Sequence, residues 1–170
     1  LLLQIQNPAY RSAFFTNNHD FMGAFGMILE IILPLFKKKT RKDFHTKFGT
    51  MTCEFGKEDQ YFYWHIYTDR FNKNKYSTSL WIEGTQIKPD EILLEKANQL
   101  IIDLKSYTDL VQNELDSKFT SEKINLSKGY KVDYVDFGLE GELEIEYSSD
   151  EQDMVSVIFN GKNIQKLELY

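Results

Sequence analysis

The stretch PDEILLEKANQLIIDLKSYTDLVQNELDSKF, residues 89–119, decides the fold class of this chain. Its apolar residues recur at spacings of three and four, which predicts one long amphipathic helix with one face turned to a core. Pro89 suits the first turn, and Asp90 and Glu91 place negative charge at the positive end of the helix dipole. The predicted core face consists of Leu93, Ala97, Leu100, Leu104, Tyr107, Val111 and Leu115, widened by Ile92, Leu94, Ile101 and Leu110.

Short runs rich in aromatic and β-branched residues flank this helix on both sides, as is typical of strands separated by turns. Asn160 and Gly161, between two such runs, form the sharpest hairpin signal in the chain. The sequence predicts an α+β fold in which an antiparallel β-sheet forms two meander blocks separated by the long helix. The runs before the helix are FGTMTCEF (48–55), YFYWHIYTD (61–69) and YSTSLWIEG (76–84); those after it are YKVDYVDF (130–137), GELEIEYSS (141–149), DMVSVIFNG (153–161) and NIQKLELY (163–170).

The N-terminal part of the chain differs from the rest, so we expect a single α+β domain over 43–170 preceded by an appendage over 1–42. Within the appendage, FMGAFGMILEIILPLF (21–36) is apolar but falls short of the roughly 20 residues of a spanning helix. Basic residues follow this run, whereas a signal peptide carries them before it. Two readings stay open: the segment packs on the domain, or residues 21–42 contact a membrane surface through apolar side chains and lysines.

Composition and charge narrow the class of partner. The chain is 42% hydrophobic and 27% charged, which is typical of a globular protein. Residues 1–75 carry 11 Lys and Arg against 7 Asp and Glu, whereas residues 76–170 carry 9 against 19. The acidic second half argues against nucleic acid as a ligand and favours a basic protein partner. A single cysteine, Cys53, cannot form an internal disulfide, which fits a reducing compartment, so we expect a cytoplasmic protein.

Motifs that bind phosphate, form a nucleophile elbow or hold zinc on a helix are missing from the sequence. The three histidines, His19, His45 and His65, lie on different segments with no spacing typical of metal ligands, and Cys53 is expected to be a buried strand residue. We therefore predict no catalytic residue, no metal and no cofactor. An enzyme of unrecognised type stays the alternative, because catalytic residues that are distant in sequence are recognised by their geometry.

Two patterned strands are candidate binding surfaces. Period two sends alternate side chains to one face of a strand, which predicts a line of negative charge from one run and an aromatic face with polar tips from another. Each surface has two readings: a docking face for a protein partner, or an ordinary solvated or cross-strand face. The candidate partner-binding residues are Glu140, Glu142, Glu144 and Glu146 on the acidic strand and Tyr61, Tyr63, His65 and Tyr67 on the aromatic strand.

A resemblance to a known class covers roughly residues 35–170. It rests on LFKKKTRKDFHTKFGTMTCEF (35–55), the aromatic strand, SLWIEG (79–84), the helix and FGLEGELEIEY (137–147). In this order the chain resembles small uncharacterised bacterial α+β domains, some of which look like immunity proteins of polymorphic toxin systems. The resemblance implies a non-enzymatic protein that binds and neutralises a cognate toxin, and it carries no set of functional residues. A membrane-associated structural domain anchored through residues 21–42 is the further alternative.

Overall fold

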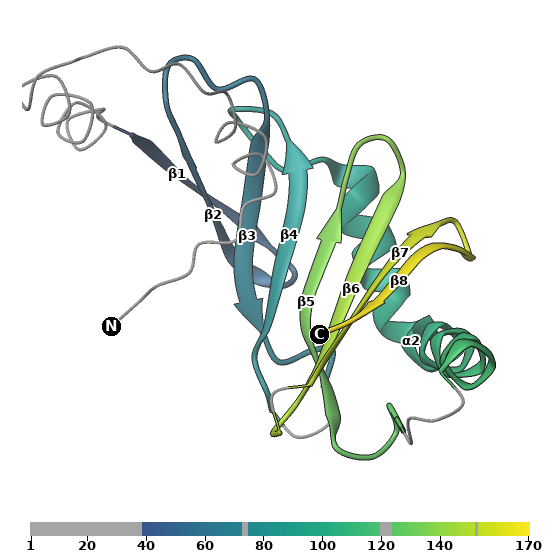
Figure 1. Cartoon of the computed structure of the whole chain (residues 1–170). Helices are drawn as coiled ribbons and strands as arrows, with labels where there is room; N and C mark the ends of the chain where they lie inside the picture. Colours follow the sequence, from purple (N-terminus) through teal and green to yellow (C-terminus); the bar gives the residue numbers. More distant parts are fainter. Residues whose placement is uncertain (1–38, 73–74, 120–123, 152) are drawn as a thin grey trace, which may run out of the picture. The chain divides into compact units, whose positions relative to one another are not determined.

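The computed structural model describes residues 39–72, 75–119, 124–151 and 153–170. Over these residues the chain forms an α+β domain with eight strands and one long helix (Figure 1), as the sequence predicts at this level. The strands before the helix are β1 (Thr40–Thr46), β2 (Gly49–Phe55), β3 (Phe62–Thr68) and β4 (Thr78–Gly84); the helix is α2 (Glu91–Lys118); the strands after it are β5 (Tyr130–Phe137), β6 (Glu142–Ser149), β7 (Met154–Asn160) and β8 (Asn163–Leu169).

The strands form one continuous sheet in the order β1 to β8, so the prediction of two separate meander blocks is wrong. Neighbouring strands are antiparallel except β4 and β5, which pair in parallel with Leu80 opposite Val135. Helix α2 is the crossover between these two strands and lies behind the second half of the sheet in Figure 1. Such a crossover returns the chain to the same end of the sheet, and the pairing satisfies two strand edges that separate blocks would leave open.

The sheet also begins earlier than the sequence indicates. Strand β1 pairs with β2 in register from Thr40 opposite Phe55 to Thr46 opposite Gly49, whereas the first strand was predicted near Phe48. The charged residues at positions 41–43 made this strand hard to predict from sequence, because charged side chains are common on edge strands but not on buried ones. The apolar run 21–36 lies outside the described residues. Among the residues that are described, no helix combines the length and apolar character needed to cross a membrane.

The predicted apolar face of α2 packs against one face of the sheet. Tyr107 meets Phe159 of β7 edge-on, with ring centroids 5.0 Å apart, and Thr108 Oγ1 lies 3.3 Å from the hydroxyl of Tyr147. Ile92, expected to widen the face, is instead 69% exposed. The buried residues of α2 are Leu93, Ala97, Leu100, Val111 and Leu115, all of them predicted, while Leu104 and Tyr107 are partly buried against the core. The core is therefore a layer between one helix and one sheet face.

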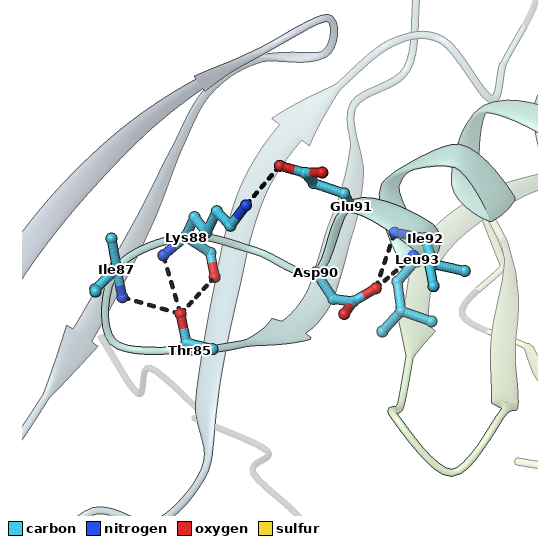
Figure 2. A network of polar contacts seen from close by, with 7 residues as sticks. All are labelled: Thr85, Ile87, Lys88, Asp90, Glu91, Ile92 and Leu93. Atoms are coloured by element: carbon cyan, nitrogen blue, oxygen red, sulfur yellow. Dashed lines mark hydrogen bonds and ion pairs between the residues drawn. The ribbon is translucent and has the colours of Figure 1, made fainter.

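The N-terminus of α2 is fixed by its cap (Figure 2). Asp90 Oδ1 accepts hydrogen bonds from the amides of Ile92 and Leu93 at 2.9 and 3.0 Å, which satisfies two donors that have no partner inside the helix. Pro89 precedes the cap and forms a bridge with Gly84, so it does not occupy the first turn as predicted. The predicted negative charge at the start of the helix is confirmed as an N-cap.

Replacing Asp90 with alanine is expected to lower the free energy of unfolding by about 1 kcal/mol, because two helix amides lose their acceptor. Asp90→Asn keeps an acceptor oxygen and should lose only a few tenths of that value. Urea denaturation of the two variants beside the native chain measures the difference. Equal losses in both variants would show that charge, and not the hydrogen bonds, is what matters at this cap.

Candidate functional site: the aromatic and acidic outer face

The sheet face opposite α2, called the outer face below, carries the residues of interest. Cross-strand partners share a face, so the pairing register shows which outer-face side chains are neighbours. His65 of β3 pairs with Trp81 of β4, and Trp81 pairs with Asp136 of β5. One row of partners runs across the eight described strands and consists of Asp43, Thr52, His65, Trp81, Asp136, Glu144, Ile158 and Lys166. This row joins residues from both sides of the helix in the sequence.

The aromatic part of the row centres on His65 and Trp81. Their rings are stacked with centroids 4.8 Å apart and planes 23° from parallel. The indole Nε1 of Trp81 donates to Ser79 Oγ at 2.8 Å, which holds the ring in place. Burial lowers the pKa of His65, so the imidazole is uncharged at neutral pH. The pair is a half-buried platform on which a partner's side chain can stack.

The acidic part begins at Asp136, next to Trp81. Its Oδ2 accepts a hydrogen bond from the hydroxyl of Tyr134 at 3.1 Å, while its Oδ1 is buried and accepts none from the residues that the structure describes. Burial raises the pKa of Asp136 to about 7, and the negative charges of Glu144 and Glu83 add to the increase. A buried carboxylate oxygen without a donor is costly, which favours the neutral, protonated form of Asp136.

Three further carboxyl groups surround Asp136 on the neighbouring strands. Glu144 Oε1 accepts a hydrogen bond from Ser156 Oγ at 3.0 Å. Burial raises the pKa of Glu146 to about 7, with the charge of Glu144 as the next cause. Glu83, buried at the end of β4, accepts a hydrogen bond from the amide of Leu139 at 2.7 Å. Strands β4 to β6 thus hold a group of partly desolvated carboxyls beside the aromatic platform.

The four predicted glutamates differ in burial. Glu142, Glu144 and Glu146 occupy alternate positions of β6, where Glu144 and Glu146 are half-buried and Glu142 is exposed and also lines a cleft beside α2. Glu140 lies in the turn between β5 and β6, where Gly141 donates to Gly138 O at 3.0 Å and has a φ of 89°. Three of the four predicted glutamates therefore alternate along β6, and Glu140 lies outside the strand. Gly138 and Gly141 belong to the turn, and β6 begins only at Glu142, so Glu140 is not part of the strand's alternation.

The aromatic prediction places more residues correctly. Tyr63 and His65 are half-buried on the outer face, and Tyr67 lies on the same face with 70% of its surface exposed. Tyr61 precedes β3 and is 66% exposed. The opposite side of β3 faces the core through Trp64, which is fully buried, as the alternation predicts. Of these residues, Tyr63 lies near the carboxyls of Glu83 and Asp136, whereas Trp81 lies between His65 and Asp136.

Tyr134 and Asp136 were not predicted as site residues. A β-bulge between Val132 and Tyr134 shifts the alternation of β5 by one residue, so a regular period assigns these side chains to the wrong face. The sequence does indicate an irregularity here. Val132 and Val135 are both apolar and three residues apart, so they would lie on opposite faces of a regular strand. Pairing with β6, where Tyr134 is opposite Glu146, resolves the ambiguity in the folded domain.

Groups that could serve metal binding or catalysis are dispersed over the described residues. His45 Nδ1 lies 2.8 Å from Thr50 Oγ1 on the β1–β2 hairpin, and no three His, Cys, Asp or Glu side chains in the described ranges are grouped to hold a metal. Burial raises the pKa of Cys53 to about 11, which fits a core thiol. The cleft beside α2, about 200 Å³, is lined by Lys96, Asp103 and Glu142 among others and contains no histidine. His19 lies outside the described residues.

No family model matches the chain, and neither does any curated protein or solved structure. The outer face is therefore the basis for a functional assignment. It combines two stacked rings with a neighbouring group of carboxyls, of which Asp136 has a buried oxygen without a hydrogen-bond partner among the described residues.

Proposed function

We propose that this chain is a non-enzymatic protein-binding domain whose outer face holds a basic protein partner. The observation that supports the proposal is the row in which the stacked His65 and Trp81 adjoin Asp136 and Glu144. Aromatic rings beside carboxylates suit lysine and arginine side chains, which stack on the rings and donate charge-assisted hydrogen bonds. Such anchors typically carry most of the energy of an interface.

The electrostatics of β4 to β6 favour a cation from outside. In the middle of this region the titratable side chains of the outer face, besides Tyr134, are carboxyls. Burial opposes the ionisation of Asp136 and Glu146 and raises the pKa of each to about 7. Basic residues flank the row on both sides, with Arg41 of β1 beside Thr52 and near His65, and Lys166 of β8 near Glu144. A cation from a partner would stabilise the ionised form of these carboxyls. The excess of Asp and Glu over residues 76–170 would also attract a basic partner over a longer range.

Within the protein-binding class we propose an immunity protein that neutralises a cognate bacterial toxin. The support is the resemblance of residues 35–170 to bacterial domains of that kind, together with a recognition surface suited to a basic partner. A toxin that presents lysine or arginine around its active surface would be blocked sterically by the domain bound over it. Inhibition of this kind needs tight binding and no chemistry from the inhibitor.

The proposal is tested by affinity capture from a lysate of the source organism with the native chain and the double variant Glu144→Gln/Glu146→Gln. These changes keep side-chain shape and remove two carboxylates, so binding of a basic partner should weaken about tenfold per lost charge-assisted contact. The matched control is Asp69→Asn/Glu151→Gln, which changes net charge equally at exposed positions in loops. Affinity of the native chain should also rise from pH 6 to pH 8, as Asp136 and Glu146 ionise.

Two readouts separate the binding proposal from the immunity proposal. Expression of the captured partner alone should arrest bacterial growth, and co-expression of the native chain, but not of the double variant, should restore it. A captured partner without toxicity would remove the immunity assignment and leave protein binding in place. Equal capture by the native chain and the double variant, with both folded, would exclude the outer face as the binding surface.

A further inference from the structure

Among the strands that the structure describes, β8 is the last in the sheet. It pairs with β7 on one side, and no strand in the described part of the chain pairs with its other side. Met154 and Tyr170 exchange both backbone hydrogen bonds, at 3.0 and 2.9 Å. Backbone groups alternate sides along a strand, so Glu168 and Lys166 also point their N–H and C=O toward β7. The N–H and C=O groups of Leu167 and Leu169 therefore point away from the sheet.

Strand β8 carries a charged lysine and a bulge in its pairing with β7, but its core side has no inward-pointing charge. Ile164, Leu167 and Leu169 face the core side and are only half-buried, whereas Lys166 and Glu168 lie on the outer face. Edge strands are commonly protected by a charge that points inward. The opposite edge, β1, has one: Lys42 pairs with buried Cys53 on the core side and lies over the ring of Phe55. Strand β8 has no counterpart of Lys42.

We propose that β8 is an interface with a second copy of this chain, in which two β8 strands pair antiparallel about a two-fold axis at Leu167. In this register the outward N–H and C=O of Leu167 bond to the same groups of its partner. Lys166 of each copy lies opposite Glu168 of the other on the outer face. The leucine side chains meet on the core side and complete the burial that β8 lacks in a single copy.

Charge selects this register over its neighbours. An axis one residue earlier places Lys166 opposite Lys166 of the other copy, and an axis one residue later places Glu168 opposite Glu168. Like charges directly opposite on paired strands are destabilising, whereas opposite charges contribute roughly 0.2–1 kcal/mol per pair. Only the axis at Leu167 forms two opposite-charge pairs. The contact involves one strand per copy, so it should be weak enough to depend on protein concentration.

The test is the molar mass of the full chain by light scattering or sedimentation over increasing protein concentration. The native chain should rise from 20.1 kDa toward twice that mass. Lys166→Glu and Glu168→Lys should each raise the dissociation constant about tenfold, because each creates two like-charge pairs. The double variant K166E/E168K should restore the native constant, since the pairs are opposite in charge again. It also restores the ion pair that these two residues form within one chain at 2.8 Å, which controls for folding.

A third variant, Leu167→Lys, gives β8 the inward charge that β1 has and should abolish the dimer while leaving the circular dichroism spectrum unchanged. A mass of 20.1 kDa at all concentrations would overturn the proposal. So would a dimer that persists in Leu167→Lys, or one that the charge swap fails to restore, because both place the interface away from β8. A monomer that pairs along β8 only with a different protein would overturn it as well.

Discussion

Replacing Gly84 with alanine is expected to destabilise the domain by about 3 kcal/mol. A Cβ at this position would lie 2.6 Å from Lys88 O, 2.7 Å from Pro89 Cα and 2.9 Å from the amide nitrogen of Asp90. All three are backbone atoms, so no side-chain rotation relieves the contact. The loop would have to move, and it carries both the N-cap of α2 and the carbonyl of Thr85, which accepts a 2.9 Å hydrogen bond from buried Trp64.

Urea denaturation of Gly84→Ala measures this effect, and Gly138→Ala provides the matched control. The nearest atom to a Cβ at Gly138 is Glu83 Oε2 at 3.8 Å, an ordinary contact, so that variant should change stability by less than about 1 kcal/mol. Reduced freedom of the unfolded chain would stabilise either variant, so similar losses in both would mean that the close approach in the β4–α2 loop does not account for the result.

Asp136→Asn is expected to stabilise the domain by about 2 kcal/mol at pH 8 and by less than about 1 kcal/mol at pH 5. The pKa of this carboxyl is raised from 3.8 to about 7, chiefly by burial. Between these two values the folded state holds a proton that the unfolded state releases, so stability falls as pH rises and levels off above about 7. Asparagine stays neutral at every pH, so it removes the cost of burying a charged carboxylate. We take this cost at pH 8 as about half of the free energy that corresponds to the full pKa shift.

Unfolding of the native chain and of Asp136→Asn by urea at pH 5, 6, 7 and 8 checks the prediction. The difference in stability between the two proteins should be smallest at pH 5 and grow as pH rises to about 7. Glu140→Gln is the control, because this exposed turn carboxylate should leave the pH dependence of the native chain unchanged. Parallel curves for the native chain and Asp136→Asn would show that Asp136 is charged at little cost, which would weaken the case for a cation at the outer face.

The candidate site shows how far the sequence predicts the structure. Tyr63, His65, Glu144 and Glu146 were predicted, because alternation along one strand is a local property of the backbone. Their placement on a common face was not predicted. It depends on β4 and β5, whose parallel pairing is set by the packing of α2 and not by any pattern in either strand. Asp136 was missed because the bulge in β5 breaks the alternation.

The sequence by itself determined the α+β class and the long helix with its buried face. These rest on local physics: the 3.6-residue period, the capping of the first turn, and the alternation of strand side chains. Only the tertiary structure decided that the strands form one sheet and that the rings and carboxyls meet in one row, with β8 as the last of the described strands. Those features depend on hydrogen bonds between segments far apart in the chain, whose register is chosen by packing and burial over the whole domain.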